Sequence, residues 1–163
     1  PRAGDRIRCG SCARNCSRTT VYFSHYLFDT YARFGRADLI LKRLDLWREY
    51  VKNGMCTPLE SPGDARSDCH AWGAHPIYHL HSGIAGVSPA APGFKSVRVA
   101  PQPGSLKVIK SKTPHPKGFV ELDLRFDGAA VRGTVRLPDG VGGEFVWGKE
   151  RLPLKPGAQE IRL

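Results

Sequence analysis

The sequence lacks the long apolar runs that mark membrane proteins. Among its 163 residues no uninterrupted apolar stretch approaches the roughly 18 residues that a membrane-spanning helix needs. Its first residues, 1–5, contain no apolar segment of the kind found in signal peptides. Because position 1 is Pro1 rather than methionine, we do not take it as the natural start. We expect no membrane partner.

The sequence also lacks any block of like charge. Its net charge is +10, from 25 Lys and Arg against 15 Asp and Glu. Residues 1–93 carry 12 basic and 8 acidic side chains, and residues 94–163 carry 13 and 7. Nucleic-acid-binding proteins cluster their basic residues on one face or helix. We therefore expect a basic, solvated surface and no nucleic-acid partner.

The cysteines do not form a recognisable framework. Their odd number argues against a secreted disulfide scaffold, and only one Cys-x-x-Cys pair is present: the five residues are Cys9, Cys12, Cys16, Cys56 and Cys69. A structural zinc site usually has four ligands on two such pairs, although Cys16, Cys56 and His70 could complete one. We predict reduced thiols, no cofactor and no metal, with a cytoplasmic location favoured.

The first half of the chain has helical periodicity. Apolar residues predict a helix over 19–34, with Val21, Tyr22 and Phe28 on one stripe, Ser17 or Thr19 as its cap and an end at Gly35. A second helix is predicted over 36–53, antiparallel to the first, with Trp47 in its core stripe. A third is predicted over about 68–83, capped by Ser67.

After Gly83 the helical period gives way to short alternating runs between Gly and Pro turns. Strands are predicted at 96–100, 120–126, 131–137, 145–147 and 159–163, and residues 107–117 fit the solvated face of a strand pair. Trp147 is expected in the core of this part, with a sugar-stacking surface as the alternative. Such strands favour an antiparallel β-sandwich. We predict two domains, residues 1–88 and 89–163, in an α+β protein whose helices are too few for a closed all-α domain.

The loop between the second and third predicted helices gathers functional residue types. Glu60 lies between two prolines, and Arg66, His70 and Trp72 follow it. Loops on a rigid scaffold often carry catalytic groups, and Trp72 and His70 could stack on a sugar and bind its hydroxyls. A solvated surface glutamate is the plainer interpretation of Glu60.

Several spaced motifs resemble the closing part of bacterial α-L-rhamnosidases, glycoside hydrolase family 78. The resemblance covers nearly the whole chain from Cys16 on. It rests on the segments CSRTTVYFSHYLF (16–28), TPLE (57–60), RSDCHAWGAHP (66–76), GVSPAAPGFKSVRVAP (86–101), LPDG (137–140) and GEFVW (143–147).

The resemblance implies the terminal helices of an (α/α)6 barrel followed by a β-sandwich, and inverting hydrolysis of terminal α-L-rhamnose. Glu60 stands where the family has its general base, and Arg66, His70 and Trp72 are the expected substrate-binding residues. Pro58 departs from the family, which has Phe or Trp at this position in the subsite wall. Arg66 or the third helix would favour the ionised form of the base.

No Asp or Glu of this chain matches the motif of the general acid, which the resemblance places in earlier barrel helices. An inverting glycosidase needs both carboxyl groups. We therefore expect this chain alone to be inactive. Its expected partners are rhamnose-containing glycosides and an N-terminal part of the same polypeptide, whose absence should leave an apolar helical face bare.

Other interpretations stay open. His75 and His79 are spaced to share a helical face and could hold zinc, although packed or half-exposed histidines are the better interpretation. The alternatives to a rhamnosidase part are a noncatalytic carbohydrate-binding β-sandwich module with a helical adapter, and a structural or zinc-stabilised interaction domain.

Overall fold

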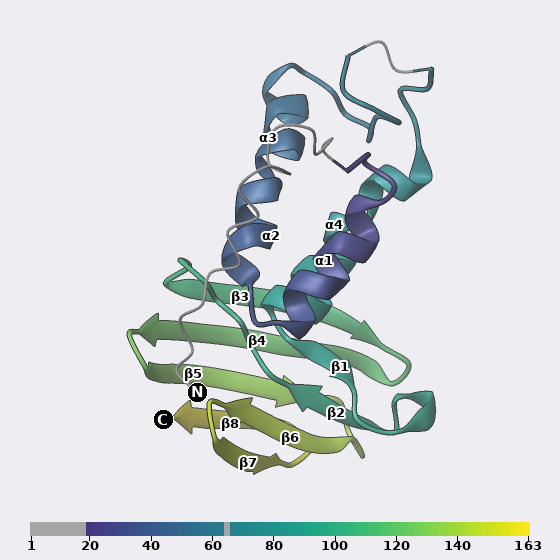
Figure 1. Ribbon diagram of the computed structural model, residues 1–163. Helices are drawn as coiled ribbons and strands as arrows, with labels where there is room; N and C mark the ends of the chain where they lie inside the picture. The colour runs from purple at the N-terminus through teal and green to yellow at the C-terminus, as the bar shows by residue number, and fades with distance from the viewer. Residues whose placement is uncertain (1–18, 64–65) are drawn as a thin grey trace.

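A helical layer stands on a β-sandwich in the computed structural model, which describes residues 19–63 and 66–163 (Figure 1). The helical layer contains α1 (Ser24–Arg33), α2 (Ala37–Arg43), α3 (Asp45–Lys52), η2 (Ala71–Ala74), α4 (Pro76–His79) and η3 (Leu80–Ile84). In Figure 1, α1 and the α2–α3 segment diverge from the sandwich like the arms of a V, and α4 runs alongside α1. None of the helices in the described ranges is long and apolar enough to cross a membrane.

The sandwich consists of two four-stranded sheets, ordered β1-β2-β6-β7 and β3-β4-β5-β8. Their strands are β1 (Val87–Pro89), β2 (Ser96–Val99), β3 (Val108–His115), β4 (Gly118–Asp127), β5 (Ala130–Leu137), β6 (Gly142–Trp147), β7 (Glu150–Leu154) and β8 (Gly157–Arg162), with a short turn, η4 (Pro92–Phe94), between β1 and β2. The predicted β-sandwich is thus confirmed. The boundary predicted between residues 88 and 89 falls inside β1 and stays a prediction.

One strand pair departs from the antiparallel prediction. The second strand, β2, pairs with β6 in parallel, with Ser96 opposite Gly142 and Val99 opposite Phe145. The reason is the route of the chain, which leaves the first sheet after β2, builds β3, β4 and β5 of the second sheet, and returns as β6.

Two strands that were not predicted contain proline. The strand β1 ends at Pro89 and β7 contains Pro153, and both strands lie at the edges of their sheet. Proline cannot donate to a strand ladder, but an edge strand has a side that needs no donor. The proline therefore interrupts the sequence signal without preventing the strand.

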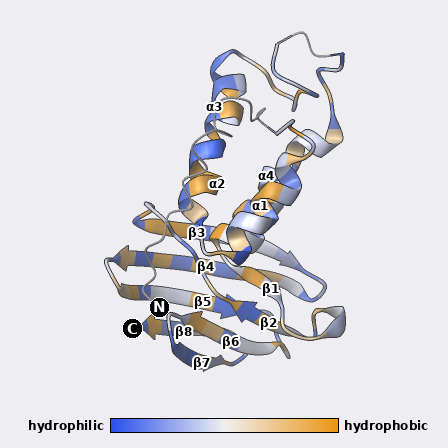
Figure 2. Cartoon of the chain, in the orientation of Figure 1, coloured by the Kyte–Doolittle hydropathy of each residue, from blue (hydrophilic) through white to orange (hydrophobic). Residues whose placement is uncertain are grey.

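The sandwich core follows the alternating pattern of the sequence. Val120, Leu122 and Leu124 of β4 are buried, and charged residues between them face outward, as the alternating colours in Figure 2 illustrate. Trp147 packs on Phe126 at a ring-centroid distance of 5.4 Å, at the margin of this core.

Helices and sandwich share one apolar core. Phe28, Ile40 and Ile84 of the helical layer belong to the same cluster of buried residues as Val97 and Phe145 of the first sheet. Two polar contacts strengthen this junction: His81 Nδ1 lies 2.8 Å from Thr113 Oγ1, and Gln102 Nε2 donates to the carbonyl of Ala32 at 2.9 Å. The helical layer is therefore fixed on the sandwich rather than tethered to it.

The first two predicted helices are shorter or interrupted. The helix α1 begins at Ser24, and the preceding turn is capped by Thr20, whose hydroxyl accepts from the Phe23 amide at 3.3 Å. Thr19 is instead bonded to Arg43, and Ser17 lies outside the described residues. The predicted second helix is divided into α2 and α3 at Leu44. At Gly35, where φ is +68°, α1 ends as expected.

The third predicted helix is wrong over its first turn. It starts at Ala71, not at residue 68, and combines a 3₁₀ turn, a short α-helix and a π turn. His70 is extended, and its amide donates to the carbonyl of Pro58 at 2.8 Å, so this segment pairs with the preceding loop instead of forming a helix. Ser67 accepts from the Cys69 amide at 3.4 Å inside that loop and caps no helix.

Candidate functional site

The loop between α3 and η2 is closed by backbone hydrogen bonds. The Glu60 amide donates to the Ser67 carbonyl at 3.0 Å, and the His70 amide donates to Pro58. The Thr57 hydroxyl donates to the Asp68 carbonyl. These bonds hold residues 57–60 beside residues 67–70. Glu60 and His70 therefore lie on two paired stretches of the same loop.

Glu60 is held by Arg66. Arg66 Nε donates to one carboxylate oxygen of Glu60 at 3.2 Å, and Nη2 donates to the other at 2.5 Å. The Glu60 side chain is only 18% exposed, whereas that of Arg66 is 82% exposed. Bidentate pairing fixes the orientation of a carboxylate more firmly than a single hydrogen bond does. The expected proximity of these two residues is therefore found.

A close backbone approach supports this loop. A Cβ added at Gly73 would lie 2.8 Å from Pro58 Cβ and 3.0 Å from the Leu59 carbonyl oxygen, so no other residue fits without displacing the loop. Trp47 Nε1 donates to the Gly73 carbonyl at 2.7 Å and anchors η2 to α3. Pro58, the departure from the family pattern, is thus packed directly against η2.

His70 and Trp72 form the second pair of predicted site residues. Their ring centroids lie 3.9 Å apart, and Trp72 remains 42% exposed. His70 Nδ1 is buried and has no hydrogen-bond partner in the part of the chain that the structure describes. No side-chain hydrogen bond joins this pair to Glu60 and Arg66 within residues 19–63 and 66–163. The two pairs are connected through the backbone of the loop.

Sequence reasoning missed Tyr22 as an aromatic neighbour of Trp72, and Tyr26 beside Tyr22. Tyr22, predicted on the core stripe, is 41% exposed and meets Trp72 edge to face at 5.2 Å. Tyr26 is 54% exposed, and its hydroxyl lies 3.4 Å from that of Tyr22. We call Tyr22, Tyr26 and Trp72 the aromatic patch. Tyr26, which lies outside the predicted stripe, could have been placed on the exposed side of α1 from the sequence, whereas Tyr22 was assigned to the core.

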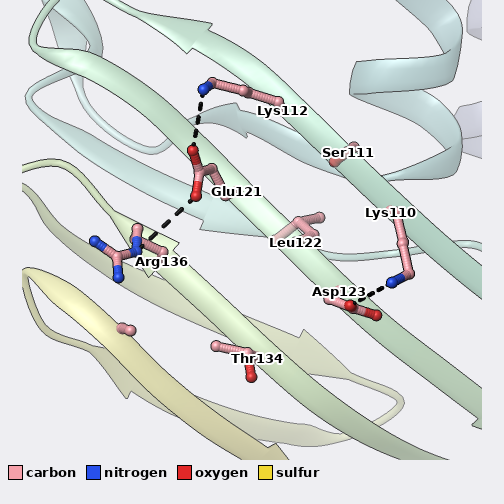
Figure 3. Close-up of a pocket in the computed structure, with 9 residues that line it drawn as sticks. Lys110, Ser111, Lys112, Glu121, Leu122, Asp123, Thr134 and Arg136 are labelled. Carbon is pink, nitrogen blue, oxygen red and sulfur yellow. Dashed lines mark ion pairs between the residues drawn. The ribbon is translucent and has the colours of Figure 1, made fainter.

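A hollow lies on the outer face of β3, β4 and β5, away from the loop. Its volume is about 470 Å³, and Figure 3 shows its charged side chains paired with one another. Lys110 lies 2.7 Å from Asp123, and Glu121 lies 3.3 Å from Lys112 and 3.9 Å from Arg136. None of the lining residues is aromatic. This hollow therefore fits the solvated strand pair predicted for residues 107–117, and its lining has no ring on which a sugar could stack.

One histidine cluster could hold a metal ion. His25, His75 and His79 each offer a ring nitrogen, and these nitrogens lie within 4.8 Å of one another. Burial lowers the pKa of His75 to about 4, and burial with the neighbouring rings of His75 and His25 lowers the pKa of His79 to about 4. Both are neutral at pH 7. Sequence reasoning paired His75 with His79 but missed His25.

Cys56 and Cys69, two of the possible zinc ligands in the sequence, take no part in that cluster. Cys56 and Cys69 are free, exposed thiols, and the predictions for Cys9, Cys12 and Cys16 fall outside the described residues.

The described residues thus form a β-sandwich that carries a helical layer, with Glu60, Arg66 and His70 on the loop before η2 and Trp72 within η2. A family model described as the bacterial alpha-L-rhamnosidase C-terminal domain matches residues 86–161. The match confirms the resemblance seen in the sequence over residues 86–161.

Solved structures extend the likeness into the helical layer. The native α-L-rhamnosidase of Aspergillus terreus superposes with a TM-score of 0.74 at 23% identity, over 85% of this chain and 18% of that one. The family GH78 rhamnosidase of Bacillus sp. GL1 superposes with a TM-score of 0.69 at 23% identity, over 80% of this chain and 15% of that one. The chain thus spans less than a fifth of either protein, and the likeness shows a shared fold. A comparison with curated proteins found no match.

Proposed function

We propose that this chain is the C-terminal part of an inverting α-L-rhamnosidase, in which Glu60 is the general base that activates water. The observation that carries the proposal is Glu60 itself, a largely shielded carboxylate on a loop tied to an exposed aromatic patch. The rhamnosidase family of residues 86–161 and the shared fold of the helical layer support it.

The loop residues have separate roles in this proposal. Arg66 orients both oxygens of Glu60 and, being mostly exposed, can release one of them to a water molecule. His70, with an unpaired ring nitrogen, bonds a sugar hydroxyl. Trp72 presents an apolar ring to one face of the sugar, and Tyr22 supports that ring from its edge. Aromatic rings with a polar margin suit ligands that are apolar on one side and hydroxylated on the other.

The general acid of the reaction lies in a part of the polypeptide outside this chain. An inverting enzyme places its acid and base about 6.5–9.5 Å apart, on opposite faces of the sugar. We propose that preceding helices of an (α/α)6 barrel supply the acid, and that this chain alone is inactive. The small share of the solved rhamnosidases that the chain spans supports this division.

The helical layer has an apolar surface that such a barrel would cover. Phe23 is 57% exposed, Ile77 61% and Tyr78 54%. Large exposed apolar side chains that gather into a patch usually mark a surface that a partner covers. We propose that the occupant of this surface is the remainder of the barrel in the same polypeptide.

Kinetics of the polypeptide that joins this chain to its barrel segment test the proposal. Glu60→Gln keeps the shape of the side chain but cannot accept a proton, so kcat on an aryl α-L-rhamnoside should fall about 10²–10⁴-fold with little change in KM. Glu160→Gln, on the exposed end of β8, is the matched control and should act like wild type. Undiminished turnover by Glu60→Gln would refute the assignment.

A further inference from the structure

Three histidines from two distant segments meet where α1 packs on α4. His25 lies on α1, His79 on α4, and His75 immediately before α4. Their ring centroids are 4.9 Å apart for His25 and His79, 5.4 Å for His75 and His79, and 5.8 Å for His25 and His75. Residues 54 positions apart in the sequence are thereby brought into one triangle of imidazole rings.

The ring spacing of this triangle approaches that of a tetrahedral metal site, and the three candidate ligand nitrogens lie within 4.8 Å of one another. With Zn–N bonds of about 2.1 Å, tetrahedral geometry separates ligand nitrogens by roughly 3.4 Å and ring centres by roughly 5 Å. His79 Nε2 and His25 Nδ1 are 3.1 Å apart, close to that spacing. A shift of a few tenths of an ångström would open this contact enough for both nitrogens to bind one ion.

The Nδ1 lone pair of His75 is also available to bind the ion. Its Nε2 lies 3.1 Å from the Val21 carbonyl oxygen, which can only accept, so Nε2 carries the proton. The remaining nitrogen, Nδ1, is buried and has no hydrogen-bond partner among residues 19–63 and 66–163. A buried, unpaired acceptor is unfavourable unless something binds it.

The outer contact of His75 also resembles that of a metal ligand, and Asp29 lies near the outer nitrogen of His79. Ligating histidines usually donate their other N–H to a backbone carbonyl or a carboxylate. His75 does so to Val21, and His79 Nδ1 lies 3.8 Å from Asp29 Oδ1. Movement of the His79 proton to Nδ1 would direct it at Asp29 and free Nε2 for the ion. Both His75 and His79 are neutral at pH 7, as metal binding requires.

We propose that His25, His75 and His79 bind one divalent ion of the borderline class, Zn²⁺ above all, through three ring nitrogens. Imidazole suits Zn²⁺, Co²⁺ and Ni²⁺, and no carboxylate of the described residues enters the first coordination sphere as Mg²⁺ or Ca²⁺ would need. Water completes the fourth position. The site joins α1 to α4 and does not depend on the rhamnosidase proposal.

Metal titration of the full chain tests this site. All five cysteines are first changed to serine, so that thiols contribute no binding. We then titrate metal-free protein with Co²⁺, whose visible absorption reports tetrahedral coordination, and displace the Co²⁺ with Zn²⁺. One ion per chain with a tetrahedral spectrum is expected. If the protein fails to bind one ion per chain at micromolar Zn²⁺, the proposal is refuted, and this result does not depend on any variant.

Ring-preserving variants assign the ligands. His75→Phe and His25→Phe should each abolish the tetrahedral spectrum, and circular dichroism verifies that they fold. Both residues are half-buried, so His25→Phe decides the matter if His75→Phe fails to fold. His81→Asn, in η3 outside the triangle, is the matched control and should bind like the parent protein. An unchanged spectrum in His25→Phe would contradict the assignment.

Discussion

Acidification from pH 7 to 5, without metal, should destabilise the fold through His79. This side chain is fully buried, and its pKa falls from 6.5 to about 4, chiefly because burial penalises the charged ring. The nearby rings of His75 and His25 act in the same direction, and the Asp29 carboxylate opposes them. In the unfolded chain the same ring has its ordinary pKa.

The sign and size of the effect follow from this difference. The unfolded state binds the proton more tightly, so the contribution of His79 to stability is complete above pH 6.5 and is lost as the pH falls towards 4. At pH 5 the unfolded ring is mostly protonated and the folded ring mostly neutral, which lowers the free energy of unfolding by about 2 kcal/mol.

Urea denaturation at pH 7, 6 and 5 in the presence of a chelator measures this loss. His79→Phe keeps a ring against Phe28 but removes the titration. Its free energy of unfolding should therefore fall by about 2 kcal/mol less than that of wild type over the same range, whatever its absolute stability. Equal pH dependence in the two proteins would show that His79 is not the buried neutral base described here.

Two further substitutions probe the loop. Gly73→Ala should destabilise the chain by about 1–3 kcal/mol in urea denaturation, because its Cβ would overlap Pro58, whereas Gly142→Ala, whose Cβ meets its first neighbour at 3.4 Å, should cost less. Equal losses in the two variants would disprove this steric argument. Trp72→Ala in the barrel-containing polypeptide should weaken L-rhamnose binding, measured by titration calorimetry, at least about tenfold, or roughly 1.4 kcal/mol. Trp147→Phe, in the sandwich, should leave binding unchanged, and retained affinity in Trp72→Ala would remove this residue from the site.

Local patterns allowed most of the sandwich to be predicted. The alternation from Val120 to Phe126 has the period of a strand, and the pairing of β4 with both β3 and β5 makes use of it. The parallel pairing of β2 with β6 could not be predicted in this way, because alternation reveals which side chains face inward but not which strand lies alongside.

In the candidate site, too, contacts between residues close in sequence could be predicted and contacts between distant residues could not. Glu60 and Arg66 are close in sequence, and their pairing was expected from that proximity. The end of the loop was mispredicted because the Asp68 and His70 backbone groups bond to residues more than a helical turn away. The contact of Tyr22 with Trp72 and the meeting of His25 with His79 depend on packing between α1 and a segment about 50 residues later, which no local pattern encodes.

The most direct test of the central claim is the anomer released by the polypeptide that joins this chain to its barrel segment. Proton NMR during the first moments of aryl α-L-rhamnoside hydrolysis distinguishes the two products before they equilibrate. Inversion with Glu60 as base predicts β-L-rhamnose first from wild type and almost no product from Glu60→Gln. Initial release of α-L-rhamnose, or normal turnover by Glu60→Gln, would contradict the account.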